Sequence, residues 1–105
     1  MFILFDQGTP LPLRLYLRDH SIRTTTEQGW ERLKNGELLK AAEDDVLLTT
    51  DKNIRFQQNL LGRKIAIIVI CLQQWPQLRS NVQRVVDAVN TITPGKYVEV
   101  LREAE

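Results

Sequence analysis

Residues 44–53 read DDVLLTTDKN, and this stretch is the strongest sequence signal for the architecture of the chain. Its apolar core, Val46 to Leu48, has no helical period and is bounded by polar residues, which predicts a buried strand of a parallel sheet. Asp51 comes directly after this strand, at the carboxyl end, where open α/β sheets bind ligands. Aspartate is also a preferred N-cap of a helix. From this stretch alone, Asp51 could be either a residue of a functional site or the N-cap of the next helix.

The same pattern recurs elsewhere in the chain. Residues 2–5 (FILF) form a continuous apolar run that ends at Asp6, and residues 64–71 (KIAIIVIC) form a third buried strand. Residues 21–26 (SIRTTT) are rich in strand-forming but polar side chains, which predicts a strand nearer the edge of the sheet. Residues 96–101 (KYVEVL) alternate and suit a final strand.

Helical segments separate these strands. The first carries Leu13, Tyr16 and Leu17 on one face, the second begins at Asn35, and short and long helices follow at residues 53–61 and 75–92. Strands that alternate with helices predict a parallel sheet between helical layers. We therefore expect residues 1–105 to form one three-layer α/β domain, with a mostly parallel central sheet of about five strands and helices on both faces.

Composition narrows the classes of function. The 105 residues suffice for one domain. The net charge of +1 is too small for the protein as a whole to attract nucleic acid electrostatically. With one cysteine, Cys71, and one histidine, His20, a zinc site of the usual type and an internal disulfide are disfavoured. The longest apolar run, at residues 65–72, is too short for a bilayer, and no signal peptide is evident. The expectation is a cytoplasmic protein without a membrane span.

Carboxylates follow the predicted strands at one edge of the sheet. Asp6 and Asp51 end two buried strands, Glu37 stands in the first turn of a helix, and Glu27 follows the second strand. Carboxylates gathered there would repel one another unless a cation neutralised them. Oxygen ligands suit Mg²⁺ or Mn²⁺, which support phosphodiester hydrolysis. The alternative is that the aspartates are helix caps and the glutamates are solvated surface groups.

Three stretches, FILFDQGTP (2–10), NGELLKAAE (35–43) and DVLLTTDKN (45–53), together with the apolar strand that follows, resemble the small bacterial PIN-like proteins. The resemblance spans about residues 2–101. It implies a PIN-like fold and a Mg²⁺ or Mn²⁺ ribonuclease site, in which Asp6 is the first acid and Asp51 the acid of a T-x-D motif. Many such relatives are predicted toxins of toxin–antitoxin pairs, each neutralised by a small antitoxin protein.

Two positions depart from the family pattern. Asn35 stands where related sequences often have aspartate, and Asn53 stands where they often complete a D-x-D motif. Asparagine can ligate a cation through its carbonyl, but it brings no charge and cannot act as a base. The expected catalytic and metal-binding set is therefore Asp6, Glu37 and Asp51, with one cation rather than two and with Glu27 as a further candidate.

Two other functions stay open at this point. The asparagines at positions 35 and 53 are compatible with a catalytically impaired interaction module that binds a protein partner or RNA. Clustered acids on a parallel sheet also suggest a receiver-like domain phosphorylated on aspartate. That function needs an acid pair directly after the first strand, and Gln7 and Gly8 do not supply one.

Substrate contacts are expected next to the acidic strand end. Lys52 and Arg55 directly follow it, so they are placed to hold RNA phosphates, with Asn53 and Asn35 as further contacts. A homodimer is compatible with the sequence, through residues 96–101 or through the long helix. The sequence favours neither interface.

Overall fold

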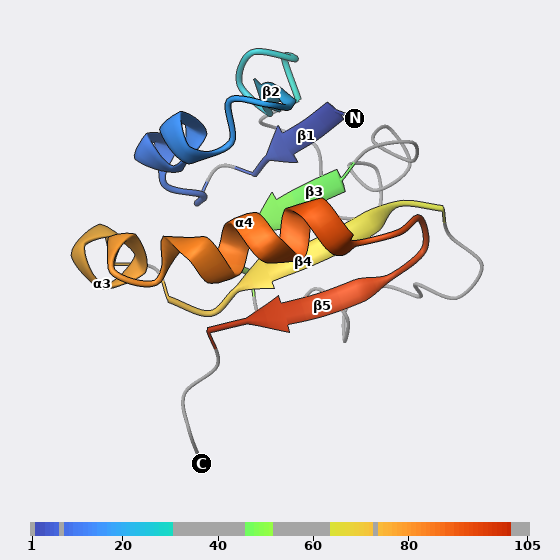
Figure 1. The fold of residues 1–105 in the computed structure, drawn as a ribbon. Coiled ribbons are helices and arrows are strands. Elements are labelled where there is room, and N and C mark those ends of the chain that lie inside the picture. The colour runs from blue at the N-terminus through green and yellow to red at the C-terminus, as the bar shows by residue number, and fades with distance from the viewer. Residues whose placement is uncertain (1, 7, 31–45, 52–63, 73, 102–105) are drawn as a thin grey trace.

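A computed structural model describes residues 2–6, 8–30, 46–51, 64–72 and 74–101, and these form a single five-stranded parallel sheet (Figure 1). The strands are β1 (Phe2–Phe5), β2 (Ser21–Thr24), β3 (Val46–Thr49), β4 (Ala66–Ile70) and β5 (Tyr97–Val100). Their order is β2-β1-β3-β4-β5, and every neighbouring pair is parallel. The predicted α/β class is confirmed, as is the place of the polar second strand at an edge.

The two strands that precede the aspartates are direct neighbours. Ile3 pairs with Val46 and Phe5 with Leu48, and the N–H of Asp6 extends the ladder by donating to the Leu48 carbonyl over 3.0 Å. The chain places β2 on one side of β1 and the later strands on the other, so the strand order reverses between β1 and β3. The carboxyl ends of these two strands therefore mark the topological switch point, the usual ligand site of such sheets.

One face of the sheet packs against the helices that the structure describes. These are the 3₁₀ helix η1 (Leu11–Tyr16), α3 (Trp75–Arg79) and α4 (Val82–Thr91), and α4 crosses in front of the sheet in Figure 1. The buried cluster on this face comprises Ile3, Phe5, Leu13, Leu17, Val46, Leu48, Ala66, Ile68, Ile70, Leu78, Val85, Val89, Ile92 and Leu101. Side chains from every strand or its flanks contribute to this face or pack against it.

The opposite face is buried as well. Leu4, Leu47, Ile67 and Val69 alternate with the first set and are almost completely shielded from solvent, and Cys71 is buried beside them. Strands buried on both faces read as continuous apolar runs, which explains the composition of β3 and β4. The helices expected to begin at Asn35 and to span residues 53–61 lie outside the described residues.

The helical segments differ from expectation in two places. The first is a 3₁₀ helix, with a proline in its first turn and no side-chain cap. The prediction of one long helix over residues 75–92 is wrong, because the helix breaks between α3 and α4. There, Ser80 Oγ donates to the Pro76 carbonyl and Asn81 Nδ2 donates to the Gln77 carbonyl. Short polar side chains of this kind compete with the backbone for helical carbonyls and favour a break. Among the described helices, none is long and apolar enough to cross a membrane.

Candidate functional site

A buried threonine joins the two aspartates at the switch point. Thr49 ends β3, and its side chain is 0% exposed. Its hydroxyl donates to Asp6 Oδ2 over 2.9 Å and accepts the backbone N–H of Asp51 over 3.1 Å. A hydroxyl offers one donor and two acceptor lone pairs, so both contacts form together. The threonine of the T-x-D motif thus fixes Asp6 and Asp51 at the same edge of the sheet.

The loop after β1 is held against β3. The Thr9 hydroxyl donates to the Leu48 carbonyl over 2.8 Å, and the Thr9 N–H donates to the Asp6 carbonyl over 2.9 Å. Gly8 passes so close to Thr50 that an added Cβ would lie 2.6 Å from the Thr50 hydroxyl oxygen. A side chain at position 8 would therefore push this loop away from β3. The backbone of Asp6 is anchored on both sides.

Glu27 closes the turn that follows β2. Its N–H donates to Thr24 Oγ1 over 3.0 Å, and the Thr24 N–H donates to Glu27 Oε1 over 2.9 Å. This reciprocal pair has the hydrogen-bond pattern of a capping box, formed here on a turn and not at the start of a helix. The Thr24 N–H is the main cause of a lowered pKa for the Glu27 carboxyl. Desolvation acts in the opposite direction and raises that pKa, whereas the Arg14 guanidinium lowers it further. The T-x-x-E spacing of residues 24–27 is the sequence signal for this turn.

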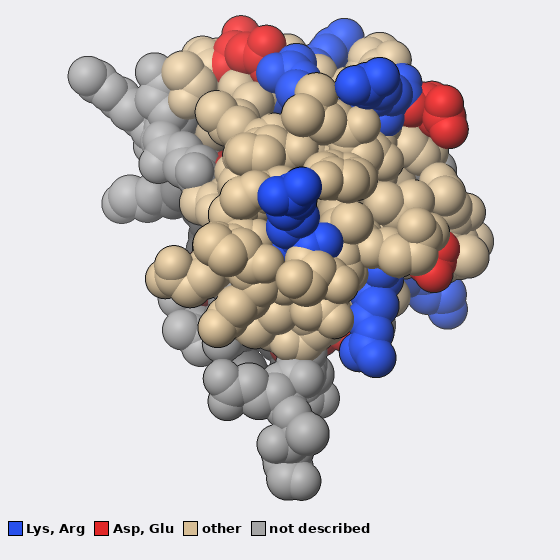
Figure 2. Space-filling model, turned by 60° about the vertical axis from the view of Figure 1, so that its left-hand side comes forward, with Lys and Arg blue, Asp and Glu red and all other residues tan. Residues whose placement is uncertain are grey.

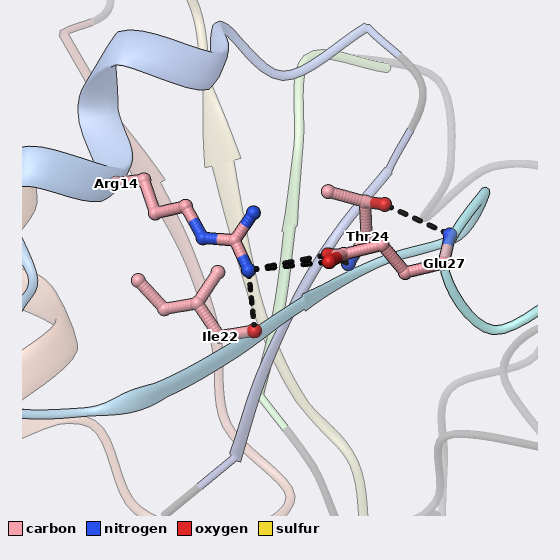
Figure 3. A network of polar contacts seen from close by, with 4 residues as sticks. All are labelled: Arg14, Ile22, Thr24 and Glu27. Atoms are coloured by element: carbon pink, nitrogen blue, oxygen red, sulfur yellow. Dashed lines mark hydrogen bonds and ion pairs between the residues drawn. The ribbon is translucent and has the colours of Figure 1, made fainter.

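Arg14 reaches from η1 to the edge strand β2 (Figure 3). Its Nη2 donates to the Ile22 carbonyl over 3.1 Å and to the two Glu27 carboxylate oxygens over 3.2 and 3.4 Å. Both side chains are almost half exposed, so the ion pair adds little to stability. Its effect is to orient both groups. No sequence pattern marks Arg14, because only the packing of η1 over β2 brings these residues together.

A pocket of about 420 Å³ lies between η1, the end of β1 and the turn after β2. Its lining residues are Phe5, Asp6, Thr9, Leu11, Arg14, Thr24, Thr25, Thr26 and Glu27. The structure thus places Glu27 at the same pocket as Asp6, but engages its carboxylate with Arg14 and Thr24. Thr25 is 2% exposed, and its buried hydroxyl has no hydrogen-bond partner in the described part of the chain.

The side chains of Asp6 and Asp51, at the carboxyl ends of β1 and β3, offer only oxygen atoms to a metal ion. Carboxylate and hydroxyl oxygens fit Mg²⁺ or Mn²⁺ and do not favour softer metals. Within the described ranges, no group of three or more His, Cys, Asp or Glu side chains is positioned to hold a metal. The other predicted site residues, Asn35, Glu37, Lys52, Asn53 and Arg55, lie outside the described residues. The structure therefore brings Asp6 and Asp51 to the same place through Thr49. Glu37, the third expected acid, remains a prediction from the sequence.

Figure 2 shows the molecule turned so that the side toward which the strands point comes forward. Most of the described surface in this view is uncharged, and the lysine and arginine side chains are spread over it. They do not merge into one basic patch. Among the described residues, the basic side chains seen on this face are therefore separate from one another.

Known proteins provide no template for this chain. No family model matches it, and neither a curated protein nor a solved structure does. The resemblance of its aspartate-bearing stretches to the PIN-like proteins therefore stays a prediction.

Proposed function

We propose that the protein is a Mg²⁺- or Mn²⁺-dependent endoribonuclease with its centre at the carboxyl ends of β1 and β3. The observation that carries this proposal is the buried Thr49 hydroxyl, which links Asp6 to Asp51. The pair lies at the switch point of a parallel sheet, where this class of fold binds ligands. The oxygen donor set fits the cations that phosphodiester hydrolysis employs.

Each residue has a distinct part in the proposed reaction. Asp6 and Asp51 bind the cation, and Glu37 is the third ligand expected from the sequence. When bound, the cation supplies an activated water and stabilises charge on the phosphate. Thr49 holds the Asp6 carboxylate in one orientation, because its hydroxyl is fixed in turn by the Asp51 N–H. Asp51 or Glu37 accepts the proton of the attacking water.

The proposed substrate is RNA, with the scissile phosphate held beside the carboxylates. Lys52 and Arg55 are assigned to its phosphates, with Asn35 and Asn53 as further polar contacts. We place the protein in the cytoplasm, where its buried Cys71 suits a reducing medium. The resemblance to PIN-like proteins extends the proposal to a toxin that a small antitoxin neutralises, with a homodimer as a compatible state.

The proposal is tested by cleavage of a pool of structured and unstructured RNAs with Mg²⁺, Mn²⁺ or EDTA. The wild type should cut in the presence of either cation and stop in EDTA. Asp51→Asn and Asp6→Asn, which keep shape and remove charge, should lower the rate by about a hundredfold or more. The matched control is Asp19→Asn. Asp19 is an exposed acid that precedes β2, so it lies toward the amino ends of the strands and away from the proposed site. Cleavage that persists in both site variants, or that occurs in EDTA, would overturn the proposal.

A second candidate is an interaction module without hydrolytic activity. The observation that favours it is the engagement of Glu27, which lines the pocket beside Asp6 but is bound by Arg14 and Thr24. A carboxylate held in this way is a poorer cation ligand. This function predicts no cleavage from well-folded protein under any cation, together with capture of a specific protein or RNA that Asp6→Asn does not impair.

A further inference from the structure

We infer that Arg14 and Glu27 form a clamp over the open edge of β2, which keeps this strand from pairing with β2 of a second copy of the chain. β2 is the outermost strand on one side of the described sheet. An edge of this kind presents backbone N–H and C=O groups to which another strand can add. The inference concerns self-association and does not rest on the proposed nuclease function.

Two residues of β2 direct their backbone groups away from β1. Successive residues of a strand in a parallel sheet turn their N–H and C=O groups to opposite sides. Thr25 donates its N–H to the Phe5 carbonyl over 3.0 Å and therefore faces β1. By this alternation, Thr24 and Ile22 face the open side. They are two residues apart, which is the spacing at which antiparallel neighbours exchange pairs of hydrogen bonds.

Most of these outward groups are occupied within the chain (Figure 3). Arg14 Nη2 donates to the Ile22 carbonyl over 3.1 Å. The Thr24 N–H donates to Glu27 Oε1 over 2.9 Å, and the Thr24 carbonyl accepts the N–H of Gln28 over 3.1 Å. Three of the four outward N–H and C=O groups of Ile22 and Thr24 are thus engaged. The contact between Arg14 and Glu27, at 3.2 Å, holds both side chains in this position.

The sequence of β2, SIRT, contains little else that would block another strand. It has no proline, and Arg23 is its one charged residue. The Arg23 guanidinium lies 4.1 Å from the centroid of the Phe2 ring, and since Phe2 belongs to β1, this contact directs Arg23 back over the sheet. The clamp itself adds little to stability, because its side chains are 43% and 49% exposed. Protection of the edge is the effect that its geometry explains best.

The test compares the sedimentation of the full chain in three forms: wild type, Arg14→Ala/Glu27→Ala and Glu27→Gln. The double variant opens the edge and should self-associate about tenfold or more tightly, beyond any species that the wild type forms through another surface. Glutamine keeps an oxygen acceptor for the Thr24 N–H, so Glu27→Gln should associate no more than the wild type. Ile68→Val, in the buried centre of β4, controls for aggregation caused by lower stability alone.

Amide hydrogen exchange locates the contact. In the dilute double variant, the Thr24 amide should exchange about tenfold faster than in the wild type, because Glu27 no longer accepts it. At high concentration, the amides of Ile22 and Thr24 should both become protected. Adding Thr24→Pro removes an outward N–H and spares the hydrogen bonds to β1, so it should abolish the extra association.

The outcomes separate edge pairing from general destabilisation. If the double variant fails to fold, Glu27→Ala serves in its place, because it still frees the Thr24 N–H. Association of the folded variant no tighter than that of the wild type would overturn the inference. Equal association of Ile68→Val, or Ile22 and Thr24 amides that stay unprotected at high concentration, would do the same.

Discussion

Replacing Thr49 with valine tests the contact on which the candidate site depends. Valine has the shape of threonine and favours a strand, so the substitution removes the hydroxyl and little else. Two hydrogen bonds are lost: one to the Asp6 carboxylate at 2.9 Å and one from the Asp51 N–H at 3.1 Å. The variant therefore reports what the hydroxyl contributes at this edge of the sheet.

The expected loss follows from the two contacts. A hydrogen bond to a charged group contributes about 1.5–3 kcal/mol. The loss of a partner for the Asp51 N–H adds less than the roughly 1–3 kcal/mol of a fully buried group, because Asp51 is only partly buried and water reaches it. Burying a methyl group in place of a hydroxyl recovers up to about 1 kcal/mol. We expect Thr49→Val to lower the free energy of unfolding by about 2 kcal/mol.

The assay is equilibrium denaturation of the full chain in urea, with Thr93→Val as the exposed control. The control should stay within about 0.5 kcal/mol of the wild type. A double-mutant cycle of Thr49→Val with Asp6→Ala isolates the pair and should give a coupling free energy of about 1 kcal/mol or more. A loss below about 0.5 kcal/mol for Thr49→Val, or a cycle without coupling, would refute the role assigned to this hydroxyl.

Three further predictions concern the loops and the core. Gly8→Ala should destabilise the protein by about 1–3 kcal/mol through its clash with Thr50 Oγ1, and the cost should shrink in a Thr50→Ala background, as compared by urea denaturation of the four proteins. Since the pKa of Glu27 is lowered in the folded state, its stabilising effect is present above the unfolded-state pKa and is lost as the pH falls through the folded-state pKa. Glu27→Gln should therefore lower the thermal midpoint at neutral pH and converge with the wild type in acid; equal differences at every pH would contradict this. Ile68→Val, in the fully buried centre of β4, should cost about 0.5–1.5 kcal/mol, and a neutral result in the same assay would show a looser core than the structure describes.

The strands and the two aspartates could be predicted because their signals are local. An apolar run with a carboxylate at its end identifies β1 with Asp6 and β3 with Asp51. Parallel strands that are buried on both faces have such continuous apolar sequences, so the pattern is easy to recognise. The T-x-x-E spacing of residues 24–27 is equally local, but Glu27 was expected as a candidate metal ligand and not as the residue that closes this turn. The role of Thr49 as the link between the aspartates required the register of β1 against β3.

The features that sequence could not predict depend on contacts between distant segments. The pairing of Arg14 with Glu27 and the pocket around Thr25 exist because η1 packs over the edge strand. The break between α3 and α4 escaped the helical pattern, since the apolar spacing continues through Ser80 and Asn81. There the competing side-chain bonds to α3 carbonyls decide the conformation.

The proposed cation site at the carboxyl ends of β1 and β3 is tested by locating where a divalent cation binds. Mn²⁺ titrated into the labelled protein broadens the NMR signals of nearby amides, so the broadened residues locate the ion. The site at the carboxyl ends of β1 and β3 predicts early, saturable broadening at Asp6 and at Thr49 to Asp51, which Asp51→Asn weakens and Asp19→Asn does not. Broadening that is scattered over exposed acids, or that Asp51→Asn leaves unchanged, would contradict a cation site at this edge of the sheet.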